Sequence, residues 1–458
     1  MQKSSPNPAQ DSFLFPNLVD QLDPRHPLLK LAQHIPWQFF EDEFAPLYSH
    51  RGKPAKPIRL MVGLSILKHV ENLSDEVLVN RWVQNPYYQV FCGETVFQWQ
   101  LPCDSSDMTY FRKRIGEAGF EKILSSSIAL FGEAAQEEEV CIDSTVQEKN
   151  VTFPTDAKQY RKIIVRAIKL ARKEGVSLSR TYAKEVKALK LKTRFAGHPR
   201  NRRTARKATK RLKTLAGRLL REIERKLPEQ TLIQHQSDIA LYQRMLNQKR
   251  GDKNKLYSLH EPHIYCMSKG KEHKKYEFGT KVSITKTRDS NIVIGAMAFD
   301  HNIYDGHSLP AVLEQVKRLA SYMPAIGLCD RGYRGKSTIG DTQILIPKPP
   351  RKNASQEQLS LARYRFRRRA GIEPVIGHLK SDYRLGRNFL KGMVGDQINV
   401  LMAAAAWNFT KWMRVFLFAC VSGTDKSQSG IKNIILSLWH CIKWRKIQQI
   451  STQVAYAA

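Results

Sequence analysis

Acidic residues are scarce in this sequence of 458 residues. Its 75 Lys and Arg outnumber 42 Asp and Glu, which leaves a formal net charge of +33 at pH 7. A protein surface does not need this imbalance, because interspersed charges of both signs keep a protein soluble with less self-repulsion. The excess of positive charge predicts a polyanionic partner, with nucleic acid as the first candidate and an anionic membrane surface as the second.

Long uncharged hydrophobic runs are also missing, which argues against the membrane. Residues 1–16 contain prolines and no apolar core, so we do not expect them to form a signal peptide. The most apolar stretch, residues 398–421, includes Lys411 and Arg414, and a charge in the middle of a bilayer is unfavourable. We expect residues 398–421 to form a buried helix and the protein to make no membrane contact.

Cysteines are few and scattered. The seven cysteines include no C-x-x-C pair and none of the Cys/His spacings that are typical of zinc sites. An odd number of scattered cysteines does not suit a disulfide framework, which predicts a reducing, cytoplasmic environment. Cys141 and Cys329 lie in apolar, strand-like runs and are expected in the core.

The first part of the chain, residues 1–130, has the pattern of a helical domain. Apolar residues recur at helical spacing over residues 58–82, and Ser74 is placed to cap a second helix there. The acidic stretch Glu133–Glu139 reads as a linker into a new unit.

That new unit has the element order of an RNase H-like fold. Strand patterns are followed by a helix that Ser308 would cap, then by two buried strands and a helix. The expected strands are residues 139–147, 275–287, 291–299, 325–330 and 344–348, and the last helix covers residues 356–382. We therefore predict an α/β protein whose RNase H-like catalytic core, a mixed sheet flanked by helices, comprises residues 138–150 and 257–417.

A basic insertion interrupts this core at residues 151–256. It holds 30 Lys and Arg against 8 Asp and Glu, so +22 of the net charge lies there. Leucines at near-heptad spacing over residues 203–227 and a similar pattern over 160–172 predict two amphipathic helices paired as a hairpin. Residues 418–458 form a basic tail without a clear role.

Three acidic residues stand out by their positions. Asp143 is expected to end one strand and Asp330 another, while Glu373 lies on the following helix. Any one of them alone has an ordinary interpretation as a turn residue, a cap or an ion-pair partner. Together, two carboxylates at adjacent strand ends and one from a helix can hold two divalent metals ~3.5–4 Å apart. Hard oxygen ligands favour Mg²⁺ or Mn²⁺.

Basic residues accompany these acids. Arg369, Glu373 and Lys380 follow one another at i, i+4 and i+11, a spacing that predicts one helix face. On that face Lys380 would meet a DNA phosphate, and Arg369 would either orient Glu373 or contact phosphate. Pro374 removes one helical N–H, which would kink the helix and direct the Glu373 carboxylate.

These motifs resemble those of a known family. The run RRRAGIEPVIGHLK at residues 367–380 matches R-x3-E-x6-K, and it resembles the Y-x2-R-x3-E-x6-K signature of DDE transposases encoded by bacterial insertion sequences. CIDST and DRGY, which contain Asp143 and Asp330, resemble that family's two upstream acidic motifs. HKKYEFGTKVSI and the N-x-Y-D-G-H run at residues 302–307 are similar to the insertion-sequence-five family. The signature's tyrosine falls on Phe366, and the basic insertion is longer than a compact member needs.

The resemblance implies a DNA transposase with Asp143, Asp330 and Glu373 as catalytic and metal-binding residues. Such an enzyme cleaves DNA at the ends of its element and transfers them into target DNA, with two Mg²⁺ or Mn²⁺ ions. It also implies an N-terminal domain that binds DNA ends, a homodimer on paired ends, and a place at the bacterial nucleoid. Two alternatives stay open: an RNase H-like nuclease or resolvase without strand transfer, and a DNA-binding protein without enzymatic activity. The expected DNA contacts are Arg331, Arg334, Arg369, Lys380, Arg203 and Lys207.

Overall fold

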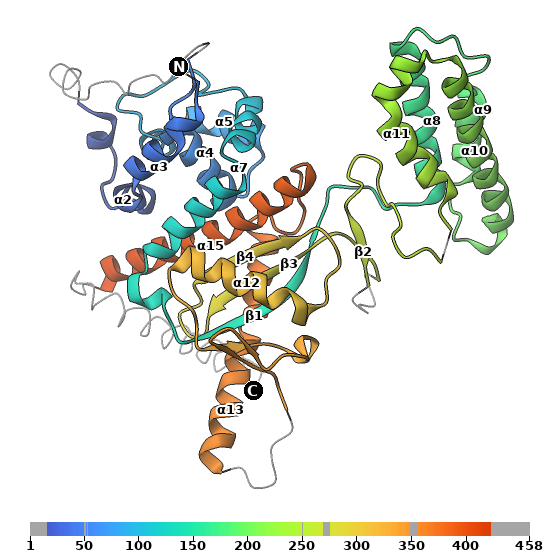
Figure 1. Cartoon of the computed structure of the whole chain (residues 1–458). Helices are drawn as coiled ribbons and strands as arrows, with labels where there is room; N and C mark the ends of the chain where they lie inside the picture. Colours follow the sequence, from blue (N-terminus) through green and yellow to red (C-terminus); the bar gives the residue numbers. More distant parts are fainter. Residues whose placement is uncertain are drawn as a thin grey trace, which may run out of the picture. The chain divides into compact units, whose positions relative to one another are not determined.

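The computed structural model describes residues 16–49, 52, 54–249, 251–268, 275–348 and 355–422. The chain divides into two compact units (Figure 1). Unit 1 comprises Met1–Gln147, Lys281–Phe299 and Ile303–Ala458, and unit 2 comprises Glu148–Thr280 and Asp300–Asn302. The tail predicted at residues 418–458 lies outside the described residues from position 423 onward.

Several of the helices that precede the sheet begin at side-chain caps that the sequence supplies. Ser74 accepts a hydrogen bond from the Val77 N–H at 3.3 Å, which confirms the predicted cap of α5. Asp104 caps α7, and Asp107 accepts from the Asp104 N–H to complete a capping box. The elements are η1 (Leu18–Gln21), α2 (Pro27–His34), α3 (Trp37–Phe44), η2 (Ala45–Leu47), α4 (Ile58–Val70), α5 (Asp75–Gln84), α6 (Pro86–Phe91), α7 (Ser105–Ala129) and η3 (Gly132–Ala135).

The sheet confirms the predicted fold class, a mixed α/β architecture with an RNase H-like strand order. Its strands run β2-β3-β1-β5-β7-β6, and β4 also pairs with β3. β3 and β4 are antiparallel, whereas β5 is parallel to both β1 and β7. The short β2 and β6 were not expected from the sequence. The strands are β1 (Glu139–Glu148), β2 (Tyr265–Met267), β3 (Glu277–Thr287), β4 (Val293–Phe299), β5 (Ile326–Leu328), β6 (Thr338–Ile339) and β7 (Thr342–Leu345).

Helices α12 (Asp305–Ala320) and α15 (Gly392–Ser422) both pack on β4 (Figure 1). Gly295 of β4 leaves room for α12, since a Cβ there would lie 2.9 Å from a Val316 methyl carbon. The prediction that Ser308 caps this helix was wrong, because α12 begins at Asp305 and the Ser308 hydroxyl donates to the Asp305 carbonyl inside the first turn.

α15 confirms the predicted buried helix. Its residues from Val400 to Ala406 are fully buried, and they share one core with the sheet and with the preceding helices of unit 1. Among the described residues, no helix is long and apolar enough to cross a membrane. Because α15, the sheet and the preceding helices share one core, the domain boundary that the sequence suggests near residue 130 lies inside unit 1.

Unit 2 is mainly helical, includes β2 and the start of β3, and has an apolar core of its own. Leu212, Leu215 and Leu219 are fully buried and belong to the same apolar cluster as Ile163. This packing of α10 on α8 confirms that the two predicted amphipathic helices pair, although α9 lies between them in the chain and they are not a simple hairpin. The helices are α8 (Asp156–Lys173), α9 (Ala183–Lys192), α10 (Pro199–Lys226) and α11 (Glu229–Asn247).

The expected single helix at residues 356–382 is two helices, α13 (Gln356–Ala370) and α14 (Ile372–Ser381). They meet at Gly371, whose ψ of −8° leaves the regular helical range. Pro374 does not kink a helix, because it is the third residue of α14. The first N–H groups of a helix have no partner within the helix, so a missing one there removes no hydrogen bond.

Candidate active site

The pairing of β1 with β5 brings Asp143 and Asp330 together. In this parallel ladder Cys141 pairs with Leu328, and each aspartate lies two residues further along its own segment. The two carboxylates therefore occupy equivalent positions just beyond the last paired residues. The strand order, rather than proximity in the sequence, makes them neighbours.

Asp143 does not end its strand, contrary to the expectation from the sequence. β1 continues to Glu148, because it stays alongside β3 after its ladder with β5 has stopped. Hydrogen bonds from Arg288 N to Glu139 O and from Lys149 N to Phe278 O show that β1 and β3 run antiparallel. The Asp143 side chain is 15% exposed and accepts from the Ser144 N–H at 2.7 Å.

Asp330 follows β5 and caps the short 3-10 helix η4 (Arg331–Tyr333). Its Oδ1 accepts from the Gly332 N–H at 2.8 Å. A Cβ on Gly332 would lie 2.9 Å from that oxygen, so only glycine permits this close turn. The Asp330 side chain is 42% exposed.

Glu373 is the second residue of α14 and is the most accessible of the three, with 67% of its side chain exposed. The helix break at Gly371 separates it from Arg369, so Arg369, Glu373 and Lys380 do not share the face of one continuous helix. Arg369 and Glu373 nevertheless approach each other across the break. Lys380 lies half-buried about two turns further along α14.

The Arg369 guanidinium contacts all three acidic residues. Its Nη2 donates to Asp143 Oδ2 at 2.9 Å and lies 3.7 Å from Asp330 Oδ2, and its Nη1 lies 3.6 Å from Glu373 Oε1. The side chain is 13% exposed, and its buried Nε has no hydrogen-bond partner among the described residues. The sequence offered two roles for Arg369, orienting Glu373 or contacting phosphate, but gave no sign of its contacts with the two aspartates.

The three carboxylates fit a divalent cation in donor type. Carboxylate oxygens are the hard ligands that Mg²⁺ and Mn²⁺ prefer. Within the described ranges, however, no group of three or more His, Cys, Asp or Glu side chains is arranged to hold a metal ion. The contacts of Arg369 explain this, because a guanidinium lies between the carboxylates.

Two further residues near these acids, Asp305 and Tyr333, were not expected from the sequence. Asp305 lies 2.7 Å from Lys281 Nζ, and its Oδ2 would be 3.5 Å from a Cβ on Gly332. Tyr333 is 1% exposed, and its hydroxyl has no hydrogen-bond partner among the described residues. Burial, followed by the charges of Asp305 and Asp143, raises the pKa of Tyr333 well above its ordinary value. The N-x-Y-D-G-H run, which contains Asp305, was the available signal.

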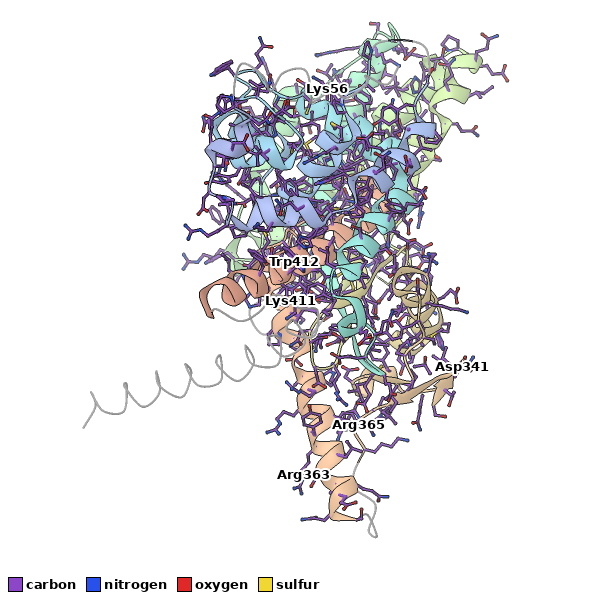
Figure 2. The ribbon with its side chains drawn as sticks, turned by 90° about the vertical axis from the view of Figure 1, so that its left-hand side faces the viewer. Lys56, Asp341, Arg363, Arg365, Lys411 and Trp412 are labelled. Carbon is purple, nitrogen blue, oxygen red and sulfur yellow. The ribbon has the colours of Figure 1, made fainter. Side chains whose placement is uncertain are left out.

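Three arginines of α13 anchor that helix beside the sheet. Arg365 lies 2.6 Å from Glu139, and Arg368 lies 2.9 Å from Asp289. Arg369, at the end of the same helix, reaches Asp143. Figure 2 shows Arg363 and Arg365 on α13, which extends away from the rest of unit 1. The run RYRFRRR indicated positive charge, but the identity of its acidic partners depends on the fold.

The remaining residues expected to bind DNA are accessible. Arg331 and Arg334 are exposed in the turn after Asp330. Arg203 and Lys207 are exposed on α10, in unit 2. Exposed basic side chains at these four positions can each meet an anionic ligand.

Two stretches of the chain match models of known protein families. Residues 16–114 match the model described as "Transposase domain (DUF772)", and residues 252–409 match "Transposase DDE domain". The second match includes Asp330 and Glu373, while Asp143 lies between the two matched ranges. A Rhizobium meliloti protein described as "Uncharacterized protein ORF8 in nfe locus" is 40% identical over 205 residues, which are 44% of this chain and 99% of that protein. No solved structure matches the chain significantly.

Proposed function

Because this chain belongs to the DDE transposases, we propose that it cleaves DNA at the ends of an insertion element and joins those ends to target DNA. One observation carries the proposal. Carboxylates from β1, from the turn after β5 and from α14 all contact the same guanidinium, that of Arg369. Three acids held around one cation are suited to hold the metal ions that phosphoryl transfer requires.

In this proposal Asp143, Asp330 and Glu373 hold two divalent metal ions, either Mg²⁺ or Mn²⁺. When bound, such a pair neutralises the scissile phosphate, activates the attacking oxygen and stabilises the leaving 3′ oxygen. Asp330 is positioned for this by its bond from the Gly332 N–H, and Asp143 by its place in β1. Arg331 and Arg334 extend from the same turn and would contact the phosphates that flank the reacting one.

The basic helices of unit 2 would hold DNA through its phosphates. Arg203 and Lys207 lie on the exposed side of α10, whereas Leu212 and Leu215 on its other side are fully buried within unit 2. An alternative role for this hairpin, a leucine-mediated dimer contact, would need those leucines at the surface. Their burial favours phosphate binding, which depends on charge and little on base sequence.

The remaining parts of the proposal concern assembly. Residues 1–130 would recognise the element ends, and residues 138–150 with 257–417 would perform catalysis. Two protomers on a pair of inverted ends are the economical arrangement, because both ends must move together and a symmetric dimer presents two equal sites.

A cleavage assay on labelled DNA from the regions that flank the gene tests the function. With Mg²⁺, a transposase yields cut ends and products joined to a target plasmid. Cut product without joining would favour a nuclease or resolvase. Binding without either product, in the presence of Mg²⁺ or Mn²⁺, would exclude the enzymatic function.

A further inference from the structure

The contacts of Arg369 have unequal lengths. The bond to Asp143 is a hydrogen bond of 2.9 Å, while the contacts with Asp330 and Glu373, at 3.7 and 3.6 Å, are longer than hydrogen bonds. The Nε of Arg369 is buried without a partner among the described residues. The guanidinium is thus held by charge in a place where its hydrogen-bonding capacity is only partly used.

A guanidinium and a divalent cation cannot occupy this place together. Both would lie within a few ångströms of the same oxygens, a separation at which two positive charges repel each other. Metal binding therefore requires the Arg369 side chain to leave at least Asp330 and Glu373. Those two carboxylates are the exposed ones, so the open side of the site faces solvent.

The backbone of α13 can stay in place while Arg369 moves. Arg365 and Arg368, on the same helix, are held at 2.6 and 2.9 Å by Glu139 and Asp289. Arg369 is the last residue but one of α13, and its flexible side chain allows the guanidinium to move without the helix. A phosphate offers the guanidinium two parallel hydrogen bonds, which suit its planar donors better than the present contacts.

Building on the proposed function, we propose that Arg369 is a positioning residue that exchanges its carboxylates for a DNA phosphate. Before metal and DNA bind, it holds the three acids together. When DNA is present, its phosphate takes the guanidinium and frees the carboxylates for the metal. Metal and DNA binding are therefore coupled through one side chain, and by linkage each ligand raises the affinity for the other by the same factor.

The coupling is measured with the full-length protein, Mn²⁺ and a duplex of the DNA that flanks the gene. Free Mn²⁺ is followed by electron paramagnetic resonance, with and without the duplex. In the wild-type protein the duplex should raise the Mn²⁺ affinity about tenfold, within the usual range of such couplings. Arg369→Gln should bind Mn²⁺ more tightly than the wild type without DNA, and the effect of the duplex should fall below about twofold.

Two further variants separate this exchange from a general loss of charge. Arg367→Gln removes a charge from an exposed position of the same helix and should keep the coupling. Arg369→Lys keeps the charge but lacks the planar donors, so this variant should keep only part of the coupling between Mn²⁺ and DNA binding. Thermal unfolding gives an independent readout. In EDTA, Arg369→Gln should unfold at a lower temperature than the wild type, and Mn²⁺ should stabilise it by a larger increment.

The outcomes distinguish this inference from the proposed function. A wild-type Mn²⁺ affinity that is equal with and without the duplex would overturn the exchange alone. So would an Arg369→Gln protein that binds Mn²⁺ more weakly than the wild type in the absence of DNA. A wild-type protein that binds no Mn²⁺ under any condition would overturn both.

Discussion

Arg369 donates a hydrogen bond of 2.9 Å to Asp143, although the two residues are 226 positions apart in the sequence. The bond joins the end of α13 to the middle of β1. It places the helical part of the candidate site beside the strand part, and so brings Glu373 near the two aspartates. Together with the ion pairs of Arg365 and Arg368, it holds the end of α13 beside the sheet.

Removal of any one acid should stop catalysis. Asp143→Asn, Asp330→Asn and Glu373→Gln should each lower cleavage on the order of 10³-fold or more, and double variants should lose little further activity, because the three acids act as one unit in the proposed site. Binding to the flanking duplex should change little. The control is Asp341→Asn, an exposed acid between β6 and β7 (Figure 2). A single variant with wild-type turnover would remove its residue from the site.

A methyl group on Gly332 should displace the Asp330 carboxylate of the candidate site. In Gly332→Ala the new Cβ would meet Asp330 Oδ1 at 2.9 Å, so either the oxygen or the turn must shift. A misplacement of about 1 Å can lower a rate about 100-fold. We expect that loss in cleavage with little change in unfolding temperature. Gly377→Ala, which has no atom within 4 Å of the added carbon, serves as the control and should cleave normally.

The basic face of α10 should determine the salt dependence of DNA binding. Replacing Arg202, Arg203, Arg206, Lys207 and Lys210 with Gln removes five exposed charges. For every phosphate that is no longer neutralised, the slope of log K against log salt should become shallower by about 0.9. Binding to element ends and to random DNA should weaken together. Arg211→Gln is the control, because Arg211 is engaged with Glu185 at 2.6 Å. An unchanged slope would instead favour the dimerisation role.

The complex with DNA should contain two protomers on two ends. The expectation follows from the reaction, in which both ends of an element must move in one step. Multi-angle light scattering of the protein bound to a flanking duplex gives the mass directly. One protomer bound to two duplexes would contradict a symmetric dimer.

Acid should destabilise the packing of α4 on α15 through His69. The ring is 2% exposed and lies between Ser65 O and Asn399 Oδ1, and burial lowers its pKa from 6.5 to about 3. The unfolded chain takes up a proton as the pH falls through 6.5 and the folded chain does not. Stability therefore decreases on acidification, by about 2 kcal/mol between pH 7 and pH 5.

Urea unfolding at both pH values tests this role of His69. The stability advantage of the wild type over His69→Gln should shrink by about 2 kcal/mol at the lower pH, because the variant lacks the titrating ring. An advantage that is the same at both values would show that His69 is not the titrating group.

Much of the fold followed from local patterns. Alternation and apolar runs located β1, β3, β4 and β5, and the predicted cap at Ser74 reflects a short side chain that accepts a nearby N–H group. The start of α12 was misplaced because Ser308 caps no helix and Tyr304 supplies no side-chain cap that a pattern could reveal. The break at Gly371 was missed because helical residues lie on both sides of it, and an isolated glycine within a helical pattern is usually tolerated.

The sequence by itself determined which residues carry charge, which segments are amphipathic, and that Asp143, Asp330 and Glu373 lie in motifs that resemble those of DDE transposases. Only the tertiary structure decided that β1 passes Asp143 without ending, that Cys141 pairs with Leu328, and that Arg369 reaches all three acids. The physical reason is range. Helix and strand periodicity depends on residues a few positions apart, whereas strand register and long-range ion pairs depend on how distant segments pack around one core.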